Sequence, residues 1–319
     1  MIDLVREQPH QFADALWRVE SAGIPAIDAP GGLTVCGMGG SAIGADLAAA
    51  AIGDRATRPL GTVRGYRLDP WLGEDTLVLC ASYSGDTEET LACFEAAGAA
   101  GAPRVALTTG GRLAELARSE GVPVIGVPGG MQPRAAVVYM TVGALECAAL
   151  CGAAPSLRGE IEATGALLAG LLDDPEPAAV AQALEGRVPI VYGAEATDPV
   201  AARWKTQINE NAKRPAFRST LPEADHNEIC GFAAGGDFTL VFLEDAGQHE
   251  RVRRRIELTA QVAEAAGLPV VRLQSRGQTP LERVMSLVLL GDLVSVQLAA
   301  LDGTDPMPVD VLERFKQAL

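Results

Sequence analysis

The sequence predicts an α/β protein of two domains, each with a mostly parallel sheet flanked by helices. Short apolar runs that contain β-branched residues alternate with longer segments rich in alanine and leucine, and this alternation is typical of βαβ units. The 319 residues are enough for about two domains. A link of small residues at 152–157, which contains a proline, separates two series of elements. We therefore expect domains at residues 1–153 and 154–319.

The order of strands and helices is clearest in the first half. We expect strands at residues 33–37, 60–66, 76–82, 104–108 and 123–127, and helices at residues 41–52, 87–99, 112–120 and 134–151. In the second half, two helices are expected before a strand at 188–192. Residues 237–274 also repeat the pattern of residues 74–109, in which a strand leads into a helix and an Ala-Gly-x-Pro turn introduces the next strand. The repeat favours a duplicated α/β unit over a chance match of two common patterns.

The charge balance and the apolar segments limit the class of protein. The chain carries 41 acidic and 26 basic residues, a formal charge of -15, which repels phosphate backbones and anionic lipid surfaces. We therefore expect neither a nucleic acid nor a membrane as a partner. Charges occur throughout residues 1–20, which lack the apolar region of a signal peptide, so we expect a cytoplasmic protein. The apolar run 284–301 has Asp292 at its middle, which favours a buried helix over a membrane span.

The cysteines do not predict a disulfide framework or a metal site. Six cysteines are scattered through apolar surroundings in a chain of this length, which favours reduced thiols in the core. Cys147 and Cys151 lie one helical turn apart, but no second pair or nearby histidine completes a zinc-binding set. We therefore expect no metal ligands in this chain.

A glycine-rich turn at residues 37–42, here called the glycine turn, joins a predicted strand to a predicted helix. Its glycines let the backbone approach a ligand, and the helix N-terminus offers unpaired N–H groups, so the turn predicts anion binding. The same Gly-Met-Gly-Gly-Ser-Ala sequence satisfies a dinucleotide fingerprint, which makes a dinucleotide oxidoreductase an alternative. The predicted strand at 60–66 ends without the acidic residue that would bind a ribose hydroxyl. This absence weakens the alternative.

A second turn, here called the serine turn (residues 82–87), carries the hydroxyls of Ser82, Ser84 and Thr87 between a strand and a helix. A structural alternative is that Ser84, Asp86 and Thr87 only cap the helix. Parallel strands end at the same edge of a sheet, so the glycine turn and the serine turn can face one crevice. Together they predict a phosphate site.

Two further observations concern this site. Arg134 begins an apolar helix, where the helix dipole disfavours a cation, so the side chain either faces the ligand or lies on the surface. In the repeated segment, the serine turn is replaced by Glu-Asp-Ala-Gly at residues 244–247. Because carboxylates repel a phosphate, we expect only the first copy to bind one.

Candidates for proton transfer lie in the second half. Glu210 stands between two asparagines near the end of a predicted helix, and His226 follows in Asp-His-Asn-Glu at residues 225–228. A carboxylate and an imidazole can move protons on and off carbon and oxygen. A single histidine is more often structural, but the two other histidines, His10 and His249, lie in charged segments typical of a surface.

Taken together and in their order along the chain, these motifs resemble the bifunctional phosphoglucose/phosphomannose isomerase family, whose members contain two sugar-isomerase (SIS) domains. The residues that carry the resemblance are 37–44, 82–90, 133–134, 209–213, 225–228 and Lys316. The serine turn indicates only a phosphosugar-binding SIS domain, whereas the Glu and His motifs are more specific to this family. The resemblance implies an α/β fold of two SIS-type domains. It also implies an aldose–ketose isomerase that interconverts glucose 6-phosphate, and mannose 6-phosphate, with fructose 6-phosphate through a cis-enediol.

The resemblance also implies a role for individual residues. The residues that match the phosphate-binding positions of the family are Ser41, Ser82, Ser84 and Thr87, with Gly39 and Gly40 lining the phosphate. Arg134 matches the cation that shields the enediolate, and Glu210 matches the base that moves a proton between C1 and C2. His226 and Lys316 match the groups that open the sugar ring, and in the family the histidine reaches the site across a dimer interface. We therefore expect a homodimer with shared active sites, and catalysis without a metal or another cofactor.

Two alternatives stay open. Family members often have a threonine where this chain has Met307, which leaves the preference between glucose and mannose phosphates open. A non-catalytic SIS protein that senses a phosphosugar would need the two turns, but not Glu210, His226 and Lys316. The presence of all three residues favours the enzyme.

Overall fold

The computed structural model describes residues 1–318, which divide into two compact units. The N-terminal unit comprises Glu7–Gly170 and Gly277–Glu282, and the C-terminal unit comprises Met1–Arg6, Leu171–Arg276 and the residues from Arg283 onward. The sequence predicts a domain boundary after residue 153, whereas the compact N-terminal unit extends to Gly170. The reason is helix α7 (Arg158–Leu171), nearly all of which belongs to that unit.

The N-terminal unit is built on a five-stranded parallel sheet in the order β2-β1-β3-β4-β5. Its strands are β1 (Gly32–Cys36), β2 (Leu60–Val63), β3 (Thr76–Ala81), β4 (Arg104–Thr108) and β5 (Val124–Gly126). Every strand expected in this half is present, although β2 and β5 are shorter than predicted. Leu33 and Val35 lie beside α3 and α6, and Cys36 belongs to the core under α4. The strand is thus buried on both faces, which explains why its sequence contains no charged residue.

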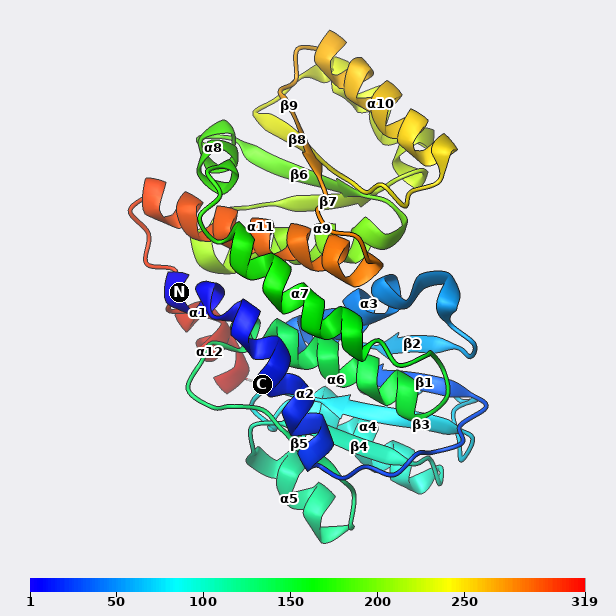
Figure 1. Cartoon of the computed structure of the whole chain (residues 1–319). Coiled ribbons are helices and arrows are strands. Elements are labelled where there is room, and N and C mark those ends of the chain that lie inside the picture. Colours follow the sequence, from blue (N-terminus) through cyan, green and yellow to red (C-terminus); the bar gives the residue numbers. More distant parts are fainter. Residues whose placement is uncertain (319) are drawn as a thin grey trace. The chain divides into compact units, whose positions relative to one another are not determined.

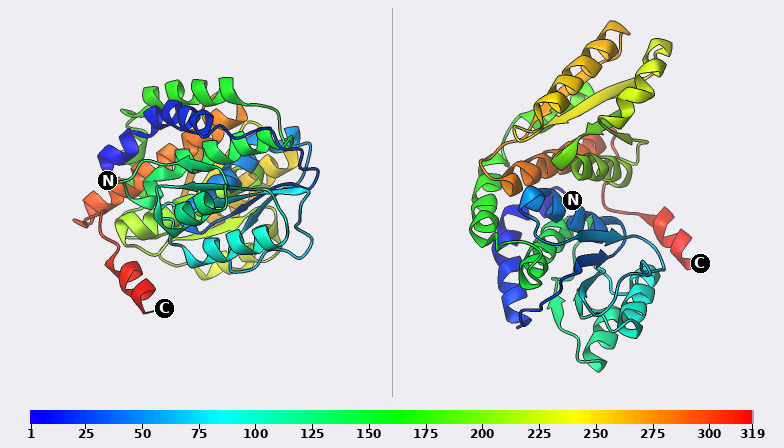
Figure 2. Two further views of the ribbon diagram at one scale, coloured as in Figure 1. Left: turned by 90° about the horizontal axis from the view of Figure 1, so that it is seen from below. Right: turned by 90° about the vertical axis from the view of Figure 1, so that its right-hand side faces the viewer.

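Helices cover both faces of this sheet (Figure 1 and Figure 2). They are α2 (Gln8–Ser21), α3 (Gly39–Ile52), α4 (Glu88–Ala99), α5 (Gly111–Ser119), α6 (Val137–Leu150) and α7, with short 3-10 turns at Gly53–Arg55 and Pro133–Ala136. The helix expected at 134–151 therefore begins with a 3-10 turn before its regular part. The carboxyl ends of β1 and β3 lead directly into α3 and α4, which places the glycine turn and the serine turn at the same edge of the sheet.

The C-terminal unit contains a four-stranded parallel sheet in the order β7-β6-β8-β9. Its strands are β6 (Val188–Gly193), β7 (Phe217–Thr220), β8 (Phe238–Glu244) and β9 (Val270–Gln274). Its helices are α1 (Ile2–Arg6), α8 (Glu176–Ala183), α9 (Asp198–Gln207), α10 (Glu250–Ala265), α11 (Pro280–Leu301) and α12 (Asp310–Gln317). In this unit α10 lies on one side of the sheet and α9 lies on the other (Figure 1 and Figure 2). The fold class predicted from the sequence, α/β with two parallel sheets flanked by helices, is confirmed.

The two sheets share one arrangement of strands. In each sheet the first strand pairs with the second on one side and with the third on the other, and the fourth strand pairs with the third. The segment β8-α10-β9 is therefore equivalent to β3-α4-β4, which agrees with the repeat seen in the sequence. The equivalence allows the turn after β8 to be compared with the serine turn after β3.

Two helices are long and apolar enough to span a membrane, at Pro133–Leu150 and Pro280–Leu301, but 78% of each is buried inside the structure. The second contains Asp292, whose carboxylate accepts hydrogen bonds from Arg203 Nε at 3.0 Å and Nη2 at 2.7 Å. Both side chains are 1% exposed, so the charge in the middle of the apolar run is paired within the core. The prediction of a buried helix is confirmed.

The cysteines agree with the prediction at five positions. Cys36, Cys80, Cys93, Cys147 and Cys151 are buried free thiols. Cys230 is exposed in the 3-10 segment Glu228–Ala234, so the expectation of a core thiol is wrong for this residue. Its neighbours in the sequence are apolar, but a short irregular segment buries few of its side chains.

Candidate functional site

The glycine turn brings the start of α3 close to the start of the 3-10 segment that carries Arg134. Met38 is extended and precedes the helix, and Gly39 has a positive φ of 50°. A Cβ atom on Gly40 would lie 3.3 Å from the carbonyl oxygen of Pro133 and 3.5 Å from Cα of Arg134. The lack of a side chain at Gly40 therefore permits this close approach, and it places the backbone of Arg134 beside the glycine turn.

The serine turn folds around its own hydroxyl groups. The hydroxyls of Ser82 and Thr87 are 2.8 Å apart, and Ser82 Oγ also accepts the Gly85 N–H at 3.1 Å. Gly85 has a φ of 80°, and a Cβ there would lie only 1.9 Å from the Gly110 carbonyl oxygen, so the turn requires glycine. Ser82 is buried, Thr87 is half-buried, and Ser84 is exposed to solvent.

The structure tests the alternative in which these residues only cap α4. Thr87 occupies the N-cap position, yet its side chain makes no capping hydrogen bond and pairs with Ser82 instead. Asp86 accepts the Arg112 N–H at 3.1 Å, and so it serves the start of α5 and not that of α4. The first turn of α4 thus receives no cap from these side chains. Its backbone N–H groups therefore point outward from the helix N-terminus, where they can bind an anion.

Tyr83 connects the glycine turn to the serine turn, a role that the sequence does not predict. Its backbone N–H donates to Ser41 Oγ at 3.3 Å, which ties the glycine turn to the serine turn. Ser41 is 8% exposed and Tyr83 is 9% exposed. A tyrosine between two serines in a turn carries no sequence signal for this role, because its partners lie far away along the chain.

Arg134 is buried, so the alternative of a surface position is wrong. Its side chain is 3% exposed, and Nη1 donates to the side-chain oxygen of Gln132 at 3.1 Å. A buried guanidinium stays charged and keeps its planar set of N–H donors. Arg134 therefore places a cation at this edge of the N-terminal sheet. The glycine turn, the serine turn and Arg134 are here called the phosphate cradle, after the ligand that the sequence predicts for them.

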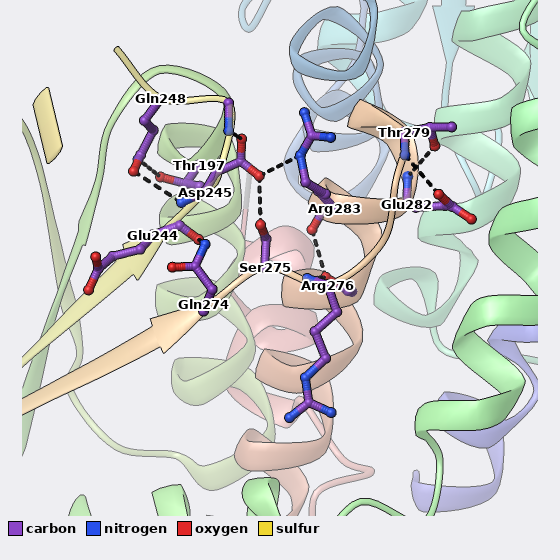
Figure 3. Close-up of polar contacts among 12 residues, drawn as sticks. Thr197, Glu244, Asp245, Gln248, Gln274, Ser275, Arg276, Thr279, Glu282 and Arg283 are labelled. Carbon is purple, nitrogen blue, oxygen red and sulfur yellow. Dashed lines mark hydrogen bonds and ion pairs between the residues drawn. The ribbon is translucent and has the colours of Figure 1, made fainter. Parts of the chain in front are cut away.

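The equivalent turn of the C-terminal unit is occupied by a carboxylate of the protein itself (Figure 3). Asp245, which follows β8 and is 5% exposed, accepts hydrogen bonds from Ser275 Oγ at 2.6 Å and from Arg283 Nε at 2.8 Å. Its second oxygen accepts the Gly247 N–H at 2.7 Å. A hydroxyl, a guanidinium and a backbone amide are the donors that bind phosphates, but here they bind Asp245. This arrangement agrees with the expectation that only the first copy binds an anion.

Glu210 lies in a π-helical turn, Ile208–Ala212, that continues α9 in the C-terminal unit. Such turns insert an extra residue and are frequent at functional sites. The turn is held by Asn211, which is fully buried and donates to Ser295 Oγ at 2.9 Å and to Gln207 Oε1 at 3.3 Å. Lys213 follows with a positive φ of 57° and donates from Nζ to the carbonyl oxygen of Glu210. The half-buried Glu210 is therefore carried by a turn whose backbone is fixed.

Glu210 lines a pocket of about 520 Å³ within the C-terminal unit. The other lining residues are Asn209, Lys213, Pro308, Val309, Asp310, Val311, Leu312 and Arg314. The C-terminal segment thus reaches the pocket of Glu210, and Met307 immediately precedes the part that lines it. Its backbone N–H donates to Asp305 at 2.9 Å.

His226 and Lys316 are exposed, and neither is among the described residues that line the pocket of Glu210. His226 ends a 3-10 segment, Glu223–His226, that is anchored through Asp225. The Asp225 carboxylate accepts from Thr259 Oγ1 at 2.6 Å and pairs with Arg255 at 3.0 Å, so the segment is bound to α10. The structure therefore holds the backbone near the imidazole while the imidazole itself faces solvent.

Glu228, two residues beyond His226, is bound from the sheet. It accepts the hydroxyls of Tyr192, at 2.8 Å, and of Ser219. Burial, reinforced by the hydrogen bond to Glu228, raises the pKa of Tyr192 far above its usual range.

Within residues 1–318, no cluster of three or more His, Cys, Asp or Glu side chains is arranged to hold a metal ion.

Comparison with known proteins identifies the family. The chain is 37% identical over 294 residues to the bifunctional phosphoglucose/phosphomannose isomerase of Aquifex aeolicus, with 90% of each chain covered. It is also 37% identical over 301 residues to the enzyme of the same name from Caldicellulosiruptor bescii, with 90% of this chain and 89% of the relative covered. The chain belongs to the bifunctional phosphoglucose/phosphomannose isomerase family. The resemblance predicted from its motifs is confirmed.

Two further comparisons place the SIS-type fold. Residues 174–319 match the family described as "Bacterial phospho-glucose isomerase C-terminal SIS domain". The C-terminal domain of glucosamine-fructose-6-phosphate aminotransferase from Francisella tularensis superposes with a TM-score of 0.78, covers 96% of both chains and shares 16% identity, which shows the fold alone. In this member of the phosphoglucose/phosphomannose isomerase family, the phosphate cradle belongs to the N-terminal unit, and Glu210, His226 and Lys316 belong to the C-terminal unit.

Proposed function

We propose that this chain is an aldose–ketose isomerase that interconverts glucose 6-phosphate and mannose 6-phosphate with fructose 6-phosphate, as a cytoplasmic homodimer. Membership of the phosphoglucose/phosphomannose isomerase family supports this reaction class. The observation that carries the proposal is the phosphate cradle, in which two hydroxyl- and amide-bearing turns and a buried arginine adjoin one another. The chain's charge of -15 makes such a cationic, donor-rich site a local exception.

The cradle would bind the phosphate and leave the sugar carbons free to react. Ser41, Ser82, Ser84 and Thr87 supply hydroxyl donors, and Gly39 and Gly40 let the phosphate approach the amides of α3. The exposed Ser84 hydroxyl is directly accessible to a ligand. Because the phosphate does not react, its binding energy would serve to position the substrate for the chemical step.

Glu210 would move the proton between the two carbons. It takes the proton from C2 of the open-chain aldose, and the electrons of that C–H bond form the C1=C2 bond of the enediolate. A proton then passes from the hydroxyl on C2 to the oxygen on C1, which becomes a hydroxyl. The same carboxyl delivers its proton to C1, and the electrons of the C1=C2 double bond form that C–H bond while the oxygen on C2 becomes the carbonyl of the ketose. The charge that develops on oxygen requires a stabilising cation, the role we assign to Arg134.

His226 and Lys316 would open the sugar ring before proton transfer. In this proposal His226 acts in the site of the partner subunit. Its exposure supports the assignment, as does its absence from the described lining of its own Glu210 pocket.

Mixing Glu210→Gln subunits with His226→Ala subunits tests the shared site, because one site of the mixed dimer receives both intact groups. Recovered activity is expected, and no recovery despite proven subunit exchange would exclude sharing.

Turnover of both aldose phosphates tests the proposed reaction. We expect the purified chain to form fructose 6-phosphate from glucose 6-phosphate and from mannose 6-phosphate, with rates unaffected by EDTA. Residues 308–312 and Arg314 line the pocket of Glu210, so Met307 adjoins a segment that can affect the preference between the two aldose phosphates. A mannose 6-phosphate rate more than about a thousandfold below the glucose 6-phosphate rate, roughly 4 kcal/mol, would limit the enzyme to one aldose. Tight phosphosugar binding without turnover would instead identify a sensor protein.

A further inference from the structure

Tyr83 makes hydrogen bonds with three separate segments of the N-terminal unit. Its backbone N–H donates to Ser41 in the glycine turn, and its carbonyl oxygen accepts the Thr109 N–H at 3.0 Å. Its side-chain hydroxyl donates to the carbonyl oxygen of Pro128 at 3.1 Å and accepts the Met131 N–H at 3.0 Å. The residue therefore links both turns of the cradle to the loop at residues 128–132.

The backbone of the 128–132 loop is hydrogen-bonded to this hydroxyl at two points. It connects β5 to the 3-10 segment that carries Arg134, and it contains the exposed Gly129 and Gly130, the latter with a φ of 87°. Within the described chain, the hydrogen bonds of the backbone at residues 128–131 are the two to Tyr83. Glycines have more backbone conformations available than other residues, so fixing them costs more entropy. The two hydrogen bonds to Tyr83 offset this cost and hold the loop in one conformation.

The chemistry of the phenol suits a tether that must donate and accept at once. Burial raises the pKa of Tyr83 above its usual value, and so the hydroxyl keeps its proton at neutral pH. A phenylalanine would fill the same space and lose both hydrogen bonds. Serine or threonine would not span the distance from the serine turn to the loop.

We propose that Tyr83 is a positioning residue that holds the 128–132 loop, and through it Arg134, beside the glycine turn and the serine turn. The proposal rests on the proposed function, because it assigns Arg134 to the enediolate. Met131 lies three residues before Arg134, and the backbone at Pro133 and Arg134 is in contact with Gly40. When the Tyr83 hydroxyl is lost, the backbone at residues 128–131 loses the two hydrogen bonds that it makes within the described chain, and the segment that leads into Arg134 is held less firmly.

Kinetics of Tyr83→Phe test the proposal. The loss of two hydrogen bonds is expected to lower kcat roughly tenfold, with KM changed less because the serine and threonine hydroxyls remain. Tyr66→Phe is the matched control, since Tyr66 lies in the same unit and is 53% exposed; it should keep full activity. An unchanged kcat for Tyr83→Phe would overturn the proposal.

A double-mutant cycle separates positioning from a general structural effect. In an Arg134→Lys background, Tyr83→Phe should lower kcat by less than about twofold, because the group it positions is already replaced. Independent, multiplicative losses would show that Tyr83 does not act through Arg134.

Hydrogen–deuterium exchange provides a readout that does not require activity. The Met131 amide should exchange faster in Tyr83→Phe, whereas amides of β3 should be unchanged. Unchanged exchange at Met131 would refute the tether. If the unsubstituted chain has no isomerase activity, the proposed function fails, and the exchange measurement still decides whether Tyr83 holds the loop.

Discussion

Asn211 donates a hydrogen bond of 2.9 Å to the hydroxyl of Ser295, and this bond ties the π-helical turn of Glu210 to helix α11. Ser295 Oγ in turn donates to the carbonyl oxygen of Asp292, which is the partner of Arg203. Two links therefore join α9 and the π-helical turn of Glu210 to α11. Arg203 bonds to Asp292, and Asn211 bonds to Ser295, three residues further along α11. Asp292 and Ser295 of this helix therefore have a common function: they fix α9 and its π-helical continuation.

Replacing Asn211 by alanine should remove this fixation. We expect a loss of about 1–3 kcal/mol in the free energy of unfolding, because the Ser295 hydroxyl stays buried without its donor. The value of kcat should fall more than in the control Thr206→Ala. Thr206 is not among the described residues that line the pocket of Glu210, and its hydroxyl donates to the Arg203 carbonyl oxygen at 2.9 Å. Equal kcat values for the two variants would show that the Asn211 bond does not orient Glu210.

Asp245, which occupies the turn of the C-terminal unit equivalent to the serine turn, leads to a prediction about stability. Asp245→Asn removes the charge that pairs with Arg283, and we expect a loss of about 3–5 kcal/mol in urea denaturation, as for other buried pairs. The control is Glu257→Gln. The side chains of Glu257 and its partner Arg254 are 42% and 53% exposed, and a surface pair contributes about 0–1 kcal/mol. Equal losses for both variants would contradict a buried, structural role for Asp245.

Glu146 predicts a dependence of stability on pH. Burial is the main cause that raises the pKa of this carboxyl, and its Oε1 has no hydrogen-bond partner among the described residues. Because the raised pKa means that the folded state binds the proton more tightly, this residue's contribution to stability decreases as pH rises through and above the usual glutamate pKa of about 4.5. Glu146→Gln should therefore raise the melting temperature at pH 7 and have little effect at about pH 4. An increase that is the same at both pH values would refute this explanation.

Much of the fold could be predicted from the sequence, because the apolar runs and the Gly and Pro positions mark the strands and turns strongly. The buried strands β1 and β3 and the helix around Asp292 lie where they were expected. Other features depend on contacts between distant segments. The Asp245–Arg283 pair and the Tyr83 tether join residues 38 and 45 to 48 positions apart, respectively, and no local pattern encodes such pairing.

The same distinction applies to the site. Hydroxyls and glycines at the ends of strands indicated the phosphate cradle, because their position after a strand has a direct physical meaning. The burial of Arg134 could not be derived, since a cation at a helix start is compatible with either a surface or a ligand. The π-helical turn of Glu210 also has no propensity signal, and tertiary hydrogen bonds such as that of Asn211 maintain it.

Substrate anchoring by the exposed serine of the cradle can be measured separately from chemistry. Ser84→Ala should raise KM for fructose 6-phosphate about tenfold, which corresponds to the loss of one hydrogen bond to a charged group, and leave kcat nearly unchanged. Ser119→Ala, at an exposed serine at the end of α5, is the control and should change neither constant. A fall in kcat at constant KM would place Ser84 in the chemical step.

The central claim, that Glu210 transfers the proton in an isomerase reaction, is tested most directly by Glu210→Gln in D2O with fructose 6-phosphate. NMR spectroscopy follows the aldose phosphates formed and the deuterium at C2, and isothermal calorimetry measures binding. We predict that the unsubstituted chain forms both aldoses with deuterium at C2, and that Glu210→Gln binds fructose 6-phosphate but forms neither. Near-normal turnover by Glu210→Gln, or binding without turnover by the unsubstituted chain, would contradict the account.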